Sequence, residues 1–277
     1  MSILRWVLWS PGGILVLGLA GAALLAPVLA PRNPAAQRLE AALTPPSRAY
    51  WLGGDEFGRD VLSRVLHGAR VSLGVAAGSV AISLTAGTAI GLAAGGRRWL
   101  DAALMRAMDA LLAVPSLVLA LAVAAALGPG WGNAAVAIGL VYVPHFARLV
   151  RAQAVALTER EFVAAARALG AGEGRVLIRH VLPNVWPTVA VLASVNAGFA
   201  IMWEASLSFL GVGVPPPTPS WGAMLRTGYP YMEHAPWIAV APGGAIFLAV
   251  LGFLTLGDRL QRWLDPRSAR TIVRTLA

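Results

Sequence analysis

The residue types that most often carry chemistry are sparse in this chain and lack the spacing that catalysis needs. Its four histidines, His67, His145, His180 and His234, form no His-Glu-x-x-His pair, and cysteine is absent. No Gly-x-Ser-x-Gly elbow occurs. Every basic residue is arginine, so the lysine of a phosphate-binding Gly-x4-Gly-Lys-Ser/Thr loop is missing. We therefore expect no catalytic residue, no metal site and no cofactor in this chain.

The composition points to a membrane protein. Of 277 residues, 57% are hydrophobic and only 13% charged, whereas soluble domains carry about 25% charged residues. The mean hydropathy is +0.68. A net charge of +9 is compatible with nucleic acid or with a membrane surface. The arginines cluster at the ends of apolar runs, which favours membrane lipid as the partner and argues against nucleic acid.

The apolar runs predict an all-α, polytopic fold. A bilayer core about 30 Å thick needs roughly 20 apolar residues in a helix. The first run could instead be a cleaved signal peptide ending at Ala30, but its length of about 18 residues exceeds the 7–15 of such a segment, so we expect an uncleaved span. The six expected spans are 13–30, 71–95, 107–127, 133–150, 186–207 and 237–256.

Arginine asymmetry sets the expected orientation. Cytoplasmic loops carry an excess of Lys and Arg. If the N-terminus lies in the cytoplasm, most arginines fall on cytoplasmic segments, including 97–106, 148–179 and 259–274. We therefore expect both termini in the cytoplasm, together with the polar segment between spans four and five.

That polar segment, 161–184, is expected to form two short helices joined by a glycine turn. Residues 161–169 are strong helix formers, and Phe162, Ala165, Ala166 and Leu169 share one face. Glycines at 170 and 172 then end the helix, and a second helix is predicted over 173–181, closed by Pro183. A small amphipathic helix of this kind can lie in a groove of a partner protein, or it can rest on the membrane interface.

A few polar residues lie in or near the expected spans. Glu204 stands near the end of span five, where it could line a passage, pair with an arginine or sit at the headgroup boundary. Asp109 and His145 are weaker cases of the same kind. Ser194 and Asn196 could line a polar passage or hydrogen-bond a neighbouring helix.

A dense charged cluster precedes span two on the expected outer side. It could be an interfacial segment with internal ion pairs, each contributing little, or a surface for an outer partner. Its members are Asp55, Glu56, Arg59, Asp60 and Arg64.

The polar segment resembles the cytoplasmic coupling loop of ABC importer membrane subunits. In that family the loop reads Glu-Ala-Ala, three residues, Gly, and later Leu-Pro. Here Ala165, Ala166, Gly170, Leu182 and Pro183 fall in register, while Ala164 replaces the usual Glu.

Two further stretches are similar to the dipeptide/oligopeptide/nickel permeases, and specifically to the C-type second permease subunit. Residues 51–64 resemble the Leu-Gly-Thr-Asp-x-x-Gly-Arg-Asp signature, with Gly54 in place of Thr. Residues 204–222 resemble the loop after span five, and 257–267 the tail. The matches extend over most of 50–267.

This resemblance implies the type I ABC importer permease fold in the inner membrane of a bacterium, and an ATP-driven importer of short peptides. It implies a homologous second permease subunit, two ABC ATPase subunits that bind ATP and Mg, and an extracytoplasmic solute-binding protein. ATPase-coupling residues would be Glu161, Phe162, Ala165, Ala166, Leu169, Gly170, His180, Leu182, Pro183 and Asn184. The translocation path would include Ser194, Asn196 and Glu204, and the binding protein would dock near Asp55, Arg59 and Asp60.

The expected domain organisation has three parts. Residues 1–70 hold the first span and an extracytoplasmic segment, 71–267 the five-helix core with a coupling loop near 151–186, and 268–277 a cytoplasmic tail. Alternatives inside the class are import of nickel, opines or glutathione. Outside it, an ion-gradient secondary transporter would require inverted repeats and paired buried ions, which the sequence does not show.

Overall fold

The computed structural model describes residues 9–96 and 98–264. Over those residues the chain is helical and contains no β-strand, which confirms the all-α prediction. The expected tail at 268–277 lies outside the described residues. The elements are α2 (Pro11–Leu24), α3 (Ala26–Leu29), η1 (Leu39–Ala41), α4 (Val61–Gly96), α5 (Arg98–Leu112), α6 (Ser116–Leu127), α7 (Trp131–Thr158), α8 (Glu161–Ala168), α9 (Glu173–Val176), the π-helical turn η2 (Leu177–Val181), α10 (Leu182–Phe209), α11 (Trp221–Gly228), η3 (Tyr229–Tyr231) and α12 (Trp237–Leu264).

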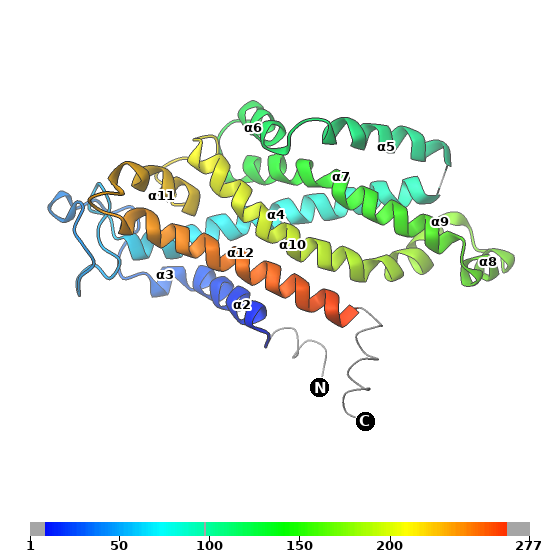
Figure 1. Cartoon of the computed structure of the whole chain (residues 1–277), viewed down its shortest axis with the longest axis horizontal. Helices are drawn as coiled ribbons and strands as arrows, with labels where there is room; N and C mark the ends of the chain where they lie inside the picture. The colour runs from blue at the N-terminus through cyan, green and yellow to red at the C-terminus, as the bar shows by residue number, and fades with distance from the viewer. Residues whose placement is uncertain (1–8, 97, 265–277) are drawn as a thin grey trace, which may run out of the picture.

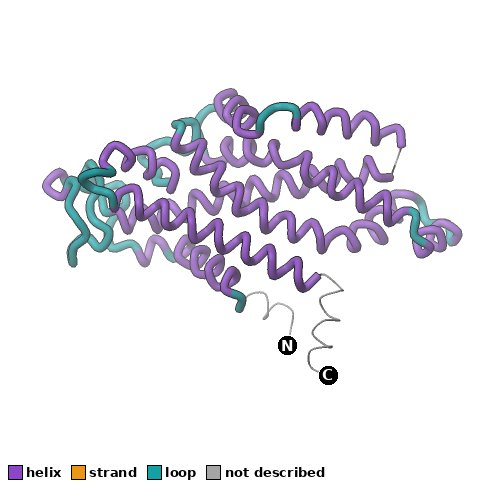
Figure 2. Tube along the Cα trace, viewed as in Figure 1, coloured by secondary structure: helices purple, strands orange, loops and turns teal. Residues whose placement is uncertain are grey.

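The long helices lie side by side along one axis of the molecule (Figure 1). Helices α4, α7, α10 and α12 form the body, with α5 beside α7 on one flank and α2 beside α12 on the other. The longest loops and α11 gather at one end of the bundle, and α8 and α9 project from the opposite end (Figure 2). The bundle therefore separates the charged cluster of 55–64 from the expected coupling loop by the full length of its helices.

Within residues 9–96 and 98–264, four helices are long and apolar enough to cross a membrane, namely α4, α7, α12 and the continuous α9–α10 segment. The pair α5 and α6 makes a fifth candidate, bent by 92° at a short break that contains Pro115, a residue that cannot continue a helix hydrogen-bond ladder. Helix α2 has 14 residues, fewer than a span usually needs. The predicted six spans are compatible with this arrangement if α2 and α3 together make one crossing.

Glycines allow α4 and α7 to pack backbone to backbone. A Cβ atom added at Gly87 would lie 2.4 Å from the Cβ of Phe146, and one at Gly91 would lie 2.6 Å from the carbonyl oxygen of Ala147. Gly95 approaches Ala154 in the same way. Spacing of four residues places all three glycines on one face of α4. These glycines therefore allow the close packing of α4 against α7.

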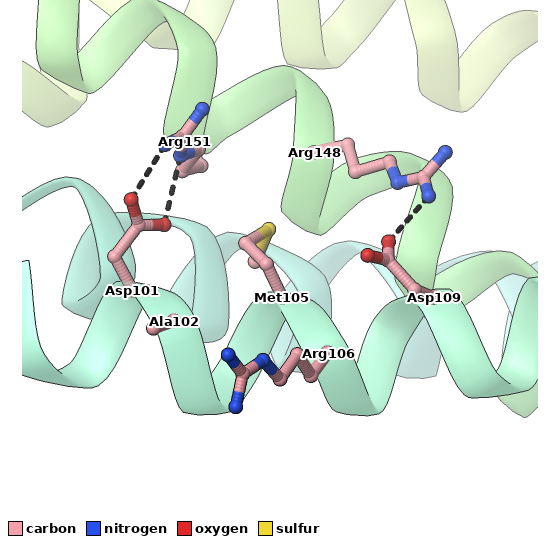
Figure 3. A pocket seen from close by; sticks show the side chains of 7 residues that line it. All are labelled: Asp101, Ala102, Met105, Arg106, Asp109, Arg148 and Arg151. Atoms are coloured by element: carbon pink, nitrogen blue, oxygen red, sulfur yellow. Dashed lines mark hydrogen bonds and ion pairs between the residues drawn. The ribbon is translucent and has the colours of Figure 1, made fainter.

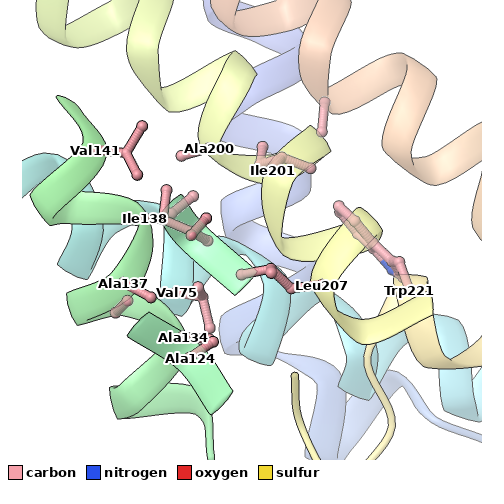
Figure 4. Packing of buried hydrophobic residues seen from close by; sticks show 14 of the residues in the cluster. Val75, Ala124, Ala134, Ala137, Ile138, Val141, Ala200, Ile201, Leu207 and Trp221 are labelled. Carbon is pink, nitrogen blue, oxygen red and sulfur yellow. The ribbon is translucent and has the colours of Figure 1, made fainter. Parts of the chain in front are cut away.

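The main hydrophobic core lies between α4, α7, α10 and α11 (Figure 4). Ile138 of α7, Ile201 and Leu207 of α10 and Trp221 of α11 are almost fully buried there. The indole Nε1 of Trp221 donates a 3.0 Å hydrogen bond to the Val65 carbonyl oxygen, which gives the buried ring its polar partner. Trp221 therefore fixes the short helix α11 on the membrane-spanning bundle.

Two sequence-based boundaries differ from the structure. Pro183 does not close a second coupling helix: α9 ends at Val176, a π-helical turn follows, and Pro183 lies in the first turn of α10. The π-helical turn just before Pro183 interrupts the regular hydrogen-bond pattern of the continuous segment, and such a local irregularity accommodates a residue without an N–H. Helix α4 also begins at Val61 and continues without a break across the expected domain boundary at residue 70.

Candidate functional site

The expected coupling loop is a helix with a defined glycine stop. Helix α8 begins at Glu161, as the sequence predicted, and ends at Ala168. Gly170 follows with a φ of +84°, a left-handed conformation that glycine adopts without strain. The Gly170 N–H donates to the Arg167 carbonyl and the Ala171 N–H donates to the Ala166 carbonyl. This hydrogen-bond pattern is a Schellman motif, which turns the chain sharply at the end of α8.

An arginine holds the two arms of the turn together. The guanidinium of Arg167 donates to both carboxylate oxygens of Glu173, at 2.9 and 3.1 Å. Its third nitrogen donates to the carbonyl oxygen of Thr158 at 3.3 Å. Because the Arg167–Glu173 pair is partly exposed, it adds little to stability, but its bidentate geometry sets the angle between α8 and α9.

Valine side chains anchor this turn to the bundle. Val163 of α8 and Val176 of α9 are fully buried. They belong to an apolar cluster that continues into α7 and α10. Helix α8 is therefore packed through Val163 onto an apolar cluster that it shares with α7 and α10. The cluster consists of Phe146, Val150, Ala154, Val163, Val176, Val181, Val185 and Val189.

Three large apolar side chains of the turn are exposed. Leu169 is 89% exposed, Ile178 67% and Phe162 43%. Large apolar side chains that gather on a polar tip mark a contact surface for a partner. Phe162 and Leu169 were expected on this surface, whereas Ile178 was not, because the predicted second helix gave it no distinct face.

The remaining predicted coupling residues lie around the same tip. Glu161, Ala165, Gly170, Pro183 and Asn184 are exposed, and Ala166, His180 and Leu182 are partly buried. Asn184 Nδ2 donates to the His180 carbonyl at 2.6 Å. The anchoring valines are not among the residues that the sequence pattern predicts. The signal in the sequence is that Val163 lies off the face that Phe162 and Leu169 share. Further valines follow at 176, 181, 185 and 189.

The polar residues expected along a passage are enclosed by the chain's own helices. Ser194 donates to the carbonyl oxygen of Phe253 in α12 at 3.0 Å. This hydrogen bond to a neighbouring helix is the second of the two roles that the sequence allows for Ser194. Asn196 is buried, and its Nδ2 atom has no partner among the described residues. Glu204 is 0% exposed. In this conformation, neither Asn196 nor Glu204 presents a side chain to the surface of the subunit.

Serine hydroxyls, and not an arginine, are the hydrogen-bond partners of Glu204. Its Oε2 accepts from Ser72 Oγ of α4 at 2.7 Å, and its Oε1 accepts from Ser208 Oγ at 2.8 Å. Ser72 Oγ in turn accepts from the backbone N–H of Trp221 at 3.2 Å. Among the described residues Glu204 forms no ion pair. The carboxyl group therefore ties α4, α10 and α11 together.

Replacing Glu204 by leucine should destabilise the outer end of the bundle more than replacing it by glutamine. Leucine leaves the Ser72 and Ser208 hydroxyls without their acceptor, at about 1–3 kcal/mol for each unsatisfied buried group. Glutamine keeps one acceptor and one donor at the same positions. Thermal unfolding of the detergent-purified protein measures the difference. Equal loss in both variants would show that the ionised acid, rather than the hydrogen bonds, is needed.

The charged cluster that precedes α4 is folded inward. Asp55 is 2% exposed, and Arg59 and Asp60 are also buried. Asp55 Oδ1 accepts from the N–H groups of Phe57 and Arg59, and its Oδ2 accepts from Arg59 Nε at 2.6 Å. Asp60 caps α4 by accepting from the N–H and hydroxyl of Ser63. The internal pairing that the sequence allowed is present, and the side chains of Asp55, Arg59 and Asp60 are buried.

Glycines make this inward turn possible. Gly58 has a φ of +68°, and a Cβ there would lie 1.7 Å from the carbonyl oxygen of Arg38. A Cβ at Gly54 would lie 2.2 Å from the carbonyl oxygen of Ala41. The glycine that replaces the threonine of the resembling signature is therefore required by this packing.

Glu56 is only partly paired within the cluster. Its Oε1 accepts from Arg59 at 2.7 Å, while its Oε2 is buried without a partner among the described residues. Burial raises the pKa of Glu56, and the neighbouring Asp55 carboxylate raises it further. A raised folded-state pKa means that this group favours folding below its unfolded pKa, and that the contribution is lost as the pH rises through the folded value.

The fold and the site together define a class: a membrane-spanning helical bundle that presents an anchored, partly apolar turn at one end. Residues 87–270 match the family described as "Binding-protein-dependent transport system inner membrane component". The chain belongs to this family of ABC importer permeases and is a multi-pass membrane protein.

Curated relatives match along most of the chain. A dipeptide transport system permease protein, DppC, of Alkalihalophilus pseudofirmus is 43% identical over 246 residues, 88% of this chain and 81% of the relative. A di/tripeptide transport system permease protein, DppC, of Pseudomonas aeruginosa is 44% identical over 264 residues, 92% of this chain and 87% of the relative. A glutathione transport system permease protein, GsiD, of Pectobacterium atrosepticum is 44% identical over 223 residues, 80% and 74% of the two chains.

A solved structure shares the fold. A chain of the MetNI methionine ABC transporter, in inward-facing conformations, superposes with a TM-score of 0.59 at 16% identity. The match includes 73% of this chain and 96% of that one. The similarity confirms the predicted type I importer permease fold.

Proposed function

We propose that this chain is the C-type permease subunit of an ATP-driven importer of short peptides. The observation that carries the proposal is the anchored turn of α8 and α9, whose exposed Phe162, Leu169 and Ile178 need a partner. The peptide-transport names of relatives at 43–44% identity support the substrate class. The chain itself is a non-catalytic subunit, since its family is a membrane permease family.

The proposed assembly supplies the missing parts. A homologous second permease subunit forms the passage together with this chain. Two ABC ATPase subunits bind ATP and Mg and grip the coupling turns, and a solute-binding protein delivers the peptide outside. Both termini and α8 face the cytoplasm, as the arginine distribution favours.

Movement of the turn drives the transport cycle in this proposal. Closure of the ATPases displaces α8, and the buried Val163 and Val176 transmit the displacement to α7 and α10. Because packed helices have discrete arrangements rather than a continuous range, the bundle switches between inward-open and outward-open states. Glu161, Ala165, Ala166, Gly170, His180 and Asn184 would surround the contact with the ATPase.

Glutathione is the second candidate substrate. The Pectobacterium relative named for glutathione transport is as similar in sequence as the peptide permeases are. Nickel and opines are further members of the same class of cargo. Competition between a dipeptide and glutathione for uptake separates the first two candidates.

Reconstitution tests the function. The chain, its partner permease, the two ATPases and the binding protein are assembled in vesicles, and uptake of a labelled dipeptide is followed. We expect uptake that requires ATP and the binding protein. Uptake that ignores ATP and collapses with a protonophore would identify an ion-gradient transporter instead.

A further inference from the structure

A charged groove lies between α5 and α7, away from the coupling turn (Figure 3). It has a volume of about 640 Å³, within the range of small-ligand sites. Met108 packs against Val143 and Ala147 and holds α5 on α7 below the groove. The lining residues are Asp101, Ala102, Met105, Arg106, Asp109, Arg148 and Arg151.

Two ion pairs cross the groove, and one arginine is left over. Arg151 Nε donates to Asp101 at 2.8 Å, and Arg148 Nη2 donates to Asp109 at 2.5 Å. The side chains of Arg148 and Asp109 are 52% and 57% exposed. Arg106 lies between Asp101 and Asp109 along α5, and in the view of Figure 3 its side chain extends to the side of α5 away from α7; it has no charged or hydrogen-bonding partner among the described residues. The groove therefore carries an unpaired positive charge beside an exchangeable ion pair.

The depth of the Asp109–Arg148 pair argues against contact with lipid headgroups. Trp99, Trp186 and Trp263 are exposed at the same end of three helices, which is the pattern of an interfacial aromatic belt. Asp109 lies ten residues after Trp99, about 15 Å further along α5 at 1.5 Å per residue. Helix α5 runs alongside α7 (Figure 1), so this distance is depth in the bilayer. Half-exposed charges at that depth must face water or protein.

We propose that this groove lines the cytoplasmic half of the substrate passage and binds the charged termini of the peptide. The inference rests on the proposed function and identifies where this subunit meets its substrate. The peptide carboxylate pairs with Arg106, whose planar guanidinium matches a carboxylate in two hydrogen bonds. The peptide ammonium pairs with Asp109, which exchanges Arg148 for the ligand.

Weak ion pairs suit such a site. A half-exposed ion pair contributes little to stability, so Asp109 changes partner at little cost. A passage must hold its cargo loosely enough to release it. The groove then prefers zwitterionic peptides to peptides with a blocked terminus, whatever their side chains are.

The absence of cysteine allows a direct test of the groove in the assembled complex. Ala102→Cys places a thiol in the groove, and Ala107→Cys places one about 140° around the same helix. Charged methanethiosulfonate reagents are added to the reconstituted complex. We expect Ala102→Cys to react several-fold faster than Ala107→Cys, and to prefer the anionic reagent. Adding Arg106→Gln should remove that preference. A thiol at 102 that reacts no faster than the thiol at 107 would overturn the proposal.

Protection by peptide tests the ligand. A dipeptide with free termini should slow the labelling of Ala102→Cys about tenfold more strongly than its carboxy-amidated form, because a charge-assisted hydrogen bond is lost. Arg106→Gln should abolish this difference. Equal protection by both forms, or none by either, would refute the site. Failure of the proposed function is distinguishable, since it appears as absent ATP-driven uptake by the cysteine-free chain.

Discussion

Substitution of Gly170 by aspartate should abolish ATP-driven uptake while leaving the chain in the membrane. Gly170 has a φ of +84° and nothing within 4 Å of where a Cβ would lie, so the backbone conformation rather than space restricts it. A side chain costs about 1–2 kcal/mol in that conformation. A carboxylate beside the exposed Leu169 would also be buried without a partner on docking, at several kcal/mol. Vesicle uptake and membrane content of the variant are measured together.

Two matched variants separate strain from charge. Gly170→Asn tolerates the left-handed conformation without adding charge, and should retain much of the uptake. Gly172 has an ordinary φ of −68° at the N-cap of α9, where aspartate is favoured, so Gly172→Asp should transport well. Normal uptake by Gly170→Asp, or equal loss at Gly172, would remove the argument for a specific turn.

Replacing Asp55 by alanine should give the largest loss of stability in the outer segment. Asp55 contacts Arg59 at 2.6 Å and Arg64 at 3.4 Å, and all three side chains are buried. Alanine leaves two buried guanidinium groups with fewer acceptors, and removing one partner of a buried pair costs about 3–5 kcal/mol. Thermal unfolding of the purified protein and proteolysis of residues 31–60 report the effect.

An exposed acid in the same segment serves as the control. Glu40 is exposed in η1, so Glu40→Ala should change stability by no more than about 0.5 kcal/mol. Asp55→Asn should fall between the two, because it keeps an acceptor for the N–H groups of Phe57 and Arg59. If Asp55→Ala is as stable as Glu40→Ala, the cluster does not hold the outer segment together.

The sequence predicts those features that depend on neighbouring residues. Hydrophobic runs mark the helices, and helix formers followed by Gly170 mark α8 and its end, because helix propensity and the left-handed stop are local properties. The glycines of α4 also predict close packing. The sequence does not show that α7 is their partner, since that pairing depends on the arrangement of the whole bundle.

The contacts of an isolated charged residue cannot be predicted from its neighbours in the sequence. Glu204 is bonded to Ser72, which lies 132 positions earlier, and no periodicity connects the two. In the sequence, Asp55 and Arg59 resemble a surface cluster, because a stretch with many charged residues is usually exposed to solvent. Gly54 and Gly58 fold the chain tightly against 38–41 and bury them. In the sequence, only Pro115 marks the break between α5 and α6. The 92° angle at this break depends on how the two helices pack.

Contact between α8 and an ATPase subunit is the central claim, and cross-linking measures it most directly. A single cysteine at Ala165, an exposed residue of α8, is joined to neighbouring proteins in the assembled complex, with Ala35→Cys in the outer segment as control. We predict a cross-link from position 165 to an ATPase subunit that changes in yield when ATP is bound, and none from position 35. A thiol at 165 that cross-links only to lipid, or that impermeant reagents reach from outside intact cells, would contradict the account.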